Sequence, residues 1–90
     1  MLDVVGTSQF KKDVKRLKRQ GKDFGAFKEI LSLLSSGHNL PAKYQDHSLK
    51  GNWKGKRDCH IEPDWVLIYE IKPGYVKLWR TGSHSELFSS

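Results

Sequence analysis

The chain has 90 residues and a formal net charge of +6, which suits one small basic domain with a single hydrophobic core. Its only cysteine, Cys59, excludes an intrachain disulfide, and no paired cysteine or histidine spacing indicates a structural metal site. No apolar run is long enough to cross a membrane, and the basic N-terminal segment lacks the apolar core of a signal peptide. We therefore expect one domain over residues 1–90 in a reducing cytoplasm.

The positive charge is concentrated near the N-terminus. Residues 1–22 contain seven lysines and arginines against two acidic residues, whereas the rest of the chain is almost balanced. A basic segment binds polyanions such as RNA or the ribosome, or an acidic protein partner, because phosphate contacts release counterions. A solvated helix face explains the same composition equally well, so charge alone does not decide between these interpretations.

The same segment has the pattern of a short strand followed by a basic amphipathic helix. The apolar run Leu2–Val5 has the length of a strand. Ser8 is the expected N-cap of the helix, and Gly21 its end. The apolar stripe of this helix consists of Phe10, Val14 and Leu17. It is flanked on one side by Lys11, Lys15 and Lys18.

A second helix is expected from Asp23 to the stop at Gly37. Its apolar positions also recur at intervals of three and four residues, at Phe24, Phe27, Ile30, Leu31 and Leu34. With so short a connection, the two helices are expected to form a hairpin.

From His38 onward the pattern changes to short β-like runs, and no helix is expected. The predicted strands are about residues 47–49, 56–61, 65–71 and 75–81, with turns at Pro63–Asp64 and Pro73–Gly74. Consecutive short turns favour an antiparallel meander. The predicted fold class is therefore α+β, with the helical hairpin packed on a twisted, mainly antiparallel sheet of four to five strands. The other face of that sheet is expected to be free.

Three of the four histidines, His47, His60 and His84, lie in this sheet half. Imidazole titrates near neutrality and can accept or donate a proton, and the guanidinium of Arg80 can hold two phosphate oxygens. These are the groups that a metal-free ribonuclease needs to cleave RNA through its own 2′-hydroxyl. Taken singly, each histidine is more often an isolated surface or core residue. The histidines and Asp64 are also a conceivable metal ligand set, but their spacing and basic surroundings lead us to expect neither metal nor cofactor.

Strand alternation sorts the residues around His60. It places Asp58 and His60 on one face and Cys59 and Ile61 on the other, which is the natural core side. His60 is therefore expected to face outward.

The same alternation leaves Arg80 unresolved. Arg80 has the parity of Val76 and Leu78, and an unpaired arginine in the core is very costly. Either the strand twists at its end, or Arg80 lies beyond the helix cover. Its noncatalytic alternative is a surface salt bridge to Glu70 or Glu86.

Four segments in order along residues 46–88 resemble the YafQ branch of the RelE/ParE superfamily of bacterial toxins. They are Asp46–Gly51, Arg57–Ile61, Asp64–Trp65 and Arg80–Phe88. Four matches in the right order are much harder to reach by chance than one short motif. The resemblance implies a RelE/ParE-like fold and the toxin of a type II toxin-antitoxin system, a ribosome-dependent mRNA endonuclease that inhibits translation.

The resemblance also implies partners and site residues. A small cognate antitoxin would wrap the toxin and repress their shared operon as a complex, so that contact with operator DNA is indirect. The family's active-site positions fall on His47, His60, Asp64, Trp65, Arg80, His84 and Phe88. Two other functions remain open: a noncatalytic ParE-like inhibitor of a target such as gyrase, and a plain RNA-binding module. Several proton carriers active near neutral pH argue against the first, whereas in the second the histidines would be incidental.

We expect His84 to be the general acid toward the 5′-oxygen leaving group and either His60 or His47 to be the base. Arg80 would stabilise the phosphorane, and Asp64 either orients a histidine or only shapes its turn. The expected ends are a 2′,3′-cyclic phosphate or 3′-phosphate and a 5′-hydroxyl. Substrate binding is expected from two aromatic and two basic residues, Trp65, Phe88, Lys50 and Lys54.

Overall fold

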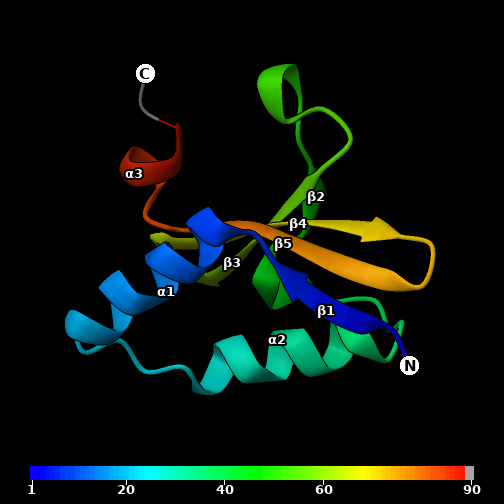
Figure 1. Ribbon diagram of the computed structural model, residues 1–90, viewed down its shortest axis with the longest axis horizontal. Helices are drawn as coiled ribbons and strands as arrows, with labels where there is room; N and C mark the ends of the chain where they lie inside the picture. Colours follow the sequence, from blue (N-terminus) through cyan, green and yellow to red (C-terminus); the bar gives the residue numbers. More distant parts are fainter. Residues whose placement is uncertain (89–90) are drawn as a thin grey trace.

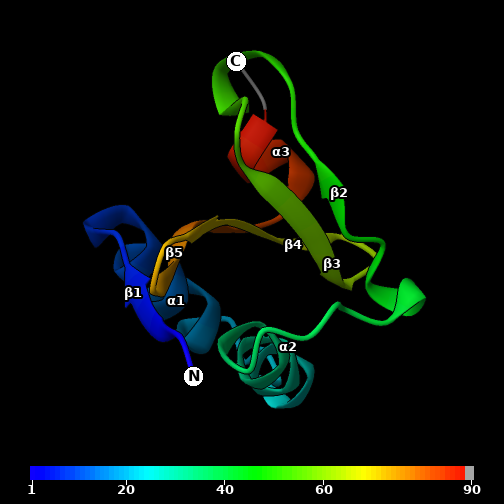
Figure 2. The same cartoon turned by 90° about the vertical axis from the view of Figure 1, so that its right-hand side faces the viewer.

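The computed structural model describes residues 1–88, and the last two residues of the predicted domain lie outside it. Its elements are β1 (Asp3–Gly6), α1 (Ser8–Arg19), α2 (Gly25–Ser35), η1 (Ala42–Tyr44), β2 (His47–Ser48), η2 (Gly51–Trp53), β3 (Arg57–Glu62), β4 (Trp65–Lys72), β5 (Tyr75–Gly82) and α3 (His84–Phe88). Figures 1 and 2 show a sheet with α2 on one face and α3 on the other. The predicted α+β class is confirmed. No helix within residues 1–88 is long and apolar enough to span a membrane.

The five strands form one mixed sheet in the order β1-β5-β4-β3-β2. The pairs from β2 to β5 are antiparallel, as the predicted meander requires, and β1 adds to β5 in parallel. The hairpin turns fall at the predicted positions, residues 63–64 and 73–74. The two parallel strands, β1 and β5, are separated by most of the sequence, so no local turn signal indicates their pairing.

The main core lies between the sheet and the layer of α1 and α2. Phe10 of α1 and Phe27 of α2 have ring centroids 6.1 Å apart, and both pack with Trp65 and Leu67 of β4 in one cluster. Cys59 and Ile61 face this core, as alternation predicted. The antiparallel hairpin of the two helices stays a prediction, because what is observed is that both lie against the same core.

The starts of two helices, α1 and α3, differ from the prediction. The N-cap of α1 is Thr7 rather than Ser8, since the Thr7 hydroxyl accepts a hydrogen bond from the Phe10 backbone N–H at 3.0 Å. The prediction that no helix follows His38 is wrong. Ser83 and Glu86 start α3 as a capping box, in which each side chain accepts a hydrogen bond from the other's backbone N–H.

The face of the sheet turned away from α2, called the outer face below, is not free as predicted. Val66 and Ile68 of β4 are fully buried there beneath Leu87 of α3. Leu49, Trp53 and Trp79 pack against this second cluster. Figure 1 shows α3 and the segment around η2 rising on this side of the sheet. The outer face is therefore a partly covered surface bordered by two short segments.

A β-bulge in β5 resolves the position of Arg80. Tyr69 lies opposite Leu78, but Ile68, the residue before Tyr69 in β4, lies opposite Arg80, so Trp79 is an extra residue in β5. An extra residue reverses the alternation beyond it. Leu78 consequently faces the core, whereas Arg80 points to the outer face.

Candidate active site

The sheet register brings candidate residues from three strands onto the outer face. Residues directly opposite each other in neighbouring strands point to the same face. Asp58 of β3 lies opposite Ile68, which lies opposite Arg80 of β5. In the next row on this face, His60 of β3 lies opposite Val66. Because Ile68 and Val66 belong to the outer cluster, Asp58, His60 and Arg80 share the outer face.

The structure brings the three sheet-half histidines together on this face. His47 of β2 lies opposite Asp58, and His84 is the first residue of α3. The ring centroids of His60 and His84 are 5.0 Å apart with planes at 71°, and those of His47 and His60 are 6.2 Å apart. His60 therefore lies between the other two rings.

His84 is oriented by Asp64, which sits in the β3–β4 turn. One Asp64 carboxylate oxygen accepts a hydrogen bond from the His84 backbone N–H at 3.1 Å and lies 2.8 Å from Nδ1 of the ring. These hydrogen bonds lower the pKa of Asp64, so the carboxylate is ionised beside the ring. With Nδ1 engaged, Nε2 of His84 remains available for proton transfer.

Asp58 is a site residue that the sequence analysis placed beside His60 without giving it a role. Its side chain is only 4% exposed, and its Oδ1 lies 2.9 Å from Nε2 of His47, without the geometry of a hydrogen bond. Burial raises the pKa of Asp58, and the positive charge of the three neighbouring histidines opposes that effect. The other nitrogen of His47 lies 2.9 Å from the Gln45 carbonyl oxygen. Each ring nitrogen of His47 thus faces an oxygen atom.

His60 differs from its two neighbours because no hydrogen bond from a described residue reaches its ring. It borders an open hollow of about 510 Å³ that is also lined by Ala26 of α2, Tyr44 and Ile61, so this hollow lies at the edge of β3 toward the core side. An imidazole with uncommitted nitrogens can accept a proton from a hydroxyl that binds on the outer face.

Arg80 is held by Asp13, a fully buried residue of α1. The two side chains form a bidentate pair, with Nε to Oδ2 at 2.8 Å and Nη2 to Oδ1 at 3.1 Å. Burial alone would raise the pKa of Asp13, but hydrogen bonds from Arg80, Arg16 and the Thr81 backbone outweigh it and leave that pKa lowered. The predicted salt-bridge alternatives were Glu70 and Glu86, but the observed partner is Asp13.

Trp65 is almost fully buried, with 1% of its surface exposed. Its ring packs on Phe24 and Phe27, and its indole N–H donates to the Thr81 hydroxyl at 2.8 Å. It also lines a hollow beside Asp64. Its role in substrate binding stays a prediction.

The other three predicted substrate-binding residues are exposed. The Phe88 ring of α3 is 39% exposed and lies 6.1 Å from the His84 ring. Lys50 and Lys54 flank η2, on the same side of the sheet as α3 (Figure 1). Phe88 is therefore a neighbour of His84, and the substrate-binding roles of all three residues stay predictions.

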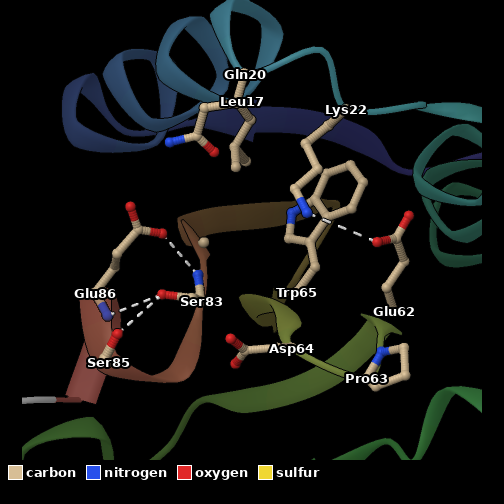
Figure 3. A pocket seen from close by; sticks show the side chains of 11 residues that line it. Leu17, Gln20, Lys22, Glu62, Pro63, Asp64, Trp65, Ser83, Ser85 and Glu86 are labelled. Atoms are coloured by element: carbon tan, nitrogen blue, oxygen red, sulfur yellow. Dashed lines mark hydrogen bonds and ion pairs between the residues drawn. The ribbon is translucent and has the colours of Figure 1, made fainter.

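A second hollow, of about 420 Å³, adjoins Asp64 on the side facing α1 (Figure 3). Its walls include Lys22, Glu62, Ser83 and Glu86, and Figure 3 shows the capping hydrogen bonds between Ser83 and Glu86 along one wall. Glu86 also pairs with Arg16 of α1, whose Nε lies 3.0 Å from a Glu86 carboxylate oxygen. The segment that carries His84 is thus fixed to α1.

A family model described as "Bacterial toxin of type II toxin-antitoxin system, YafQ" matches residues 2–89. The chain belongs to the YafQ toxin family. It is 44% identical to the mRNA interferase toxin YafQ of Escherichia coli K12 over 87 residues, which cover 96% of this chain and 95% of that protein.

Solved structures of YafQ toxins agree with this membership. The toxin in a DinJ-YafQ toxin-antitoxin complex from E. coli matches with a TM-score of 0.90 and 43% identity, covering 98% of both chains. A copper-bound mutant toxin from Helicobacter pylori matches with a TM-score of 0.94 and 42% identity, covering 98% of this chain and all of that one. The predicted membership of the YafQ branch is confirmed.

Copper in that relative raises the question of a metal site in this YafQ-family chain. Within residues 1–88, no three His, Cys, Asp or Glu side chains are grouped as metal ligands. Nδ1 of His47 faces a carbonyl oxygen and Nδ1 of His84 faces Asp64. A histidine that binds a metal commonly has its other ring nitrogen engaged in this way, so these contacts are no argument against a metal. Metal-independent chemistry stays a prediction.

Proposed function

We propose that this YafQ-family toxin is an endoribonuclease that cuts mRNA on the ribosome by attack of the RNA's own 2′-hydroxyl. The observation that carries the proposal is the set of three adjacent imidazoles with one carboxylate at each end, Asp58 beside His47 and Asp64 beside His84. A fold that only binds RNA has no need of this arrangement. The relative from E. coli K12 is named an mRNA interferase toxin, which supports the same activity here.

The proposed roles follow the environments of the rings. His60, with uncommitted nitrogens, takes the proton from the 2′-hydroxyl as its oxygen bonds to phosphorus, and His47 is the alternative base. His84 gives a proton to the departing 5′-oxygen and is restored between turnovers by solvent. Arg80 stabilises the charge on the phosphorane. The products are a 2′,3′-cyclic phosphate, which water converts to a 3′-phosphate, and a 5′-hydroxyl end.

Partners are proposed from the same relatives and from charge. The DinJ-YafQ complex supports a cognate antitoxin, and binding to operator DNA would then pass through that antitoxin. The basic α1 is a candidate contact for ribosomal RNA or for an acidic antitoxin segment. Ribosomes place the proposed activity in the cytoplasm.

The decisive test is the chemistry of the cut ends in a reconstituted translation reaction, with and without ribosomes. We expect fragments with 5′-hydroxyl ends that become ligatable only after phosphorylation, and cyclic or 3′-phosphate ends on the upstream fragments. Fragments with 5′-phosphate and 3′-hydroxyl ends would exclude attack by the 2′-hydroxyl. Growth inhibition without any mRNA cleavage would exclude the nuclease function itself.

A further inference from the structure

The outer face carries a row of charged residues at the end of the sheet far from His84. Glu70 of β4 lies opposite Lys77 of β5. Lys56 directly precedes β3, whose first residue, Arg57, lies opposite Tyr69, so continuing that register brings Lys56 beside Glu70. Lys56, Glu70 and Lys77 are thus neighbours on the outer face.

Trp79, the extra residue of the bulge, organises this row. Nζ of Lys77 lies 4.1 Å from the centroid of the Trp79 ring system and Nζ of Lys56 lies 4.6 Å from it. The indole N–H donates to Glu70 at 3.1 Å, and Lys72 pairs with the other oxygen of Glu70 at 3.5 Å. Two ammonium groups therefore lie against the Trp79 ring, and a third pairs with the Glu70 carboxylate. We call Lys56, Lys72, Lys77 and Trp79 the lysine row.

The lysine row is ordered rather than a set of free surface side chains. Burial alone would raise the pKa of Glu70, but the Trp79 hydrogen bond and the charges of Lys72 and Lys56 outweigh it and lower that pKa. Glu70 is thus ionised and anchors the row. Since contacts with the ring and the carboxylate already restrict the lysines, binding an anion costs less side-chain entropy than it would for free lysines.

The lysine row and the histidines lie on one face and at a fixed separation. Lys56 precedes His60 by four residues along one extended strand, which corresponds to about 13 Å at the usual rise of a strand. The row of Asp58 and Arg80 lies between them. A phosphate at the histidines and another at the lysine row are therefore a few nucleotides apart on a single strand.

We propose that the lysine row binds the phosphate backbone of the same RNA strand that the histidines cut, a few nucleotides from the scissile bond. The proposal rests on the proposed nuclease function for its choice of ligand. Both lysines over the ring keep their ammonium N–H groups as donors for phosphate oxygens. The contact is independent of base identity, because it reads only backbone charge.

An acidic antitoxin segment is the other polyanion that suits three lysines. RNA is favoured because the row continues the face of the histidines, where a bound strand must already run to be cut. The Trp79 ring faces are occupied by ammonium groups, so the row presents charge rather than an apolar anchor for a peptide.

The test measures binding of a short single-stranded RNA whose 2′-hydroxyls are methylated, so that it cannot be cut. Fluorescence anisotropy across a salt series compares the wild type with Lys56→Ala/Lys77→Ala. Lys28→Glu on the opposite layer is the control, because it changes the net charge by the same amount at an exposed position of α2. Circular dichroism verifies that all three proteins are folded.

We expect the double variant to bind more weakly and its logarithmic salt slope to fall by about 1.4, since each single-strand phosphate contact contributes about 0.7. Lys28→Glu should keep the wild-type slope. Equal slopes for the double variant and the wild type overturn the proposal, and so does an equal loss in Lys28→Glu. A loss of antitoxin affinity with unchanged RNA binding assigns the row to a protein partner and also overturns it. Because this RNA cannot react, failure of the nuclease function would leave these results unchanged.

Discussion

Asp64 and His84 are joined at two points, the backbone N–H of His84 at 3.1 Å and its ring Nδ1 at 2.8 Å from a single carboxylate oxygen. One side chain in the β3–β4 turn thereby fixes both the position of the first residue of α3 and the direction of its imidazole. The free Nε2 is the atom from which a leaving group would take its proton.

His84→Ala should abolish growth inhibition and reduce cleavage by a factor of about 10² to 10⁴, the usual contribution of a general acid. The side chain is 44% exposed, so its removal should leave the fold intact. Single-turnover cleavage in the ribosome assay measures the loss, and retained antitoxin binding is the control. Wild-type cleavage by folded His84→Ala would reject the assignment.

Asp64→Asn should lower the rate less than His84→Ala, because asparagine keeps an oxygen that can accept hydrogen bonds from His84 but lacks the charge of the carboxylate. The pKa of Asp64 is lowered, so its contribution to stability exists above the ordinary aspartate range and is lost as pH falls through the lowered value. Single-turnover cleavage and thermal unfolding across pH measure the two effects. A wild-type cleavage rate in Asp64→Asn would show that Asp64 only shapes its turn.

Arg80→Ala should slow cleavage, because it removes roughly 3 to 4 kcal/mol of transition-state stabilisation. Asp13→Asn should cause a smaller loss, because the guanidinium remains while its bidentate partner is gone. Arg80→Lys should not restore the rate, since a single ammonium cannot replace the planar fork. The three rates are measured under single-turnover conditions, with thermal unfolding as the control for Asp13. Normal cleavage by Arg80→Ala would leave Arg80 with a structural role only.

Asp58→Asn should stabilise the fold at neutral pH while lowering activity. Burial raises the pKa of Asp58, so the protein is favoured below the ordinary aspartate range and loses that contribution as pH rises through the raised value. Replacing the carboxylate removes this loss, by an amount on the order of 1 kcal/mol for a poorly paired buried group. Thermal unfolding across pH tests this, and a uniformly lower melting temperature in the variant would contradict it.

The free protein should cleave a naked RNA substrate at nearly the same rate with and without a chelator. Arg80 and imidazolium supply the positive charge that the reaction needs. Naked RNA is specified because ribosomes themselves need magnesium. A transition metal should instead inhibit, since imidazole nitrogens needed for proton transfer are good ligands. Activity lost with chelator and restored by one particular metal would refute this mechanism.

Short-range patterns predicted the strands and the two long helices well. Residues 65–71 and 75–81 are rich in β-branched and aromatic residues and are separated by a turn at Pro73–Gly74, and the observed β4 and β5 extend each by one residue. The capping box of Ser83 and Glu86 was also readable, but a helix of five residues is too short to show periodicity. It was therefore missed.

Other features depend on contacts between distant segments. The direction of Arg80 follows from the bulge at Trp79, and parity within one strand contains no signal for an inserted residue. Asp13 looked like one more polar residue of a basic helix, yet it is fully buried because Arg80 arrives from a strand 67 positions later. Trp65 matched a family motif, but that match does not say which face of the sheet its ring occupies.

Because α3 is short, it can unfold locally and inactivate the toxin without global unfolding. Five residues cannot hold a helix by themselves, so α3 persists through its cap, the burial of Leu87 and the pair of Glu86 with Arg16. These contacts are few beside those of the main core, and local opening should precede cooperative melting. On warming, the protein should therefore lose its nuclease activity while amide protons in β4 are still protected from exchange, and recover it on cooling without refolding.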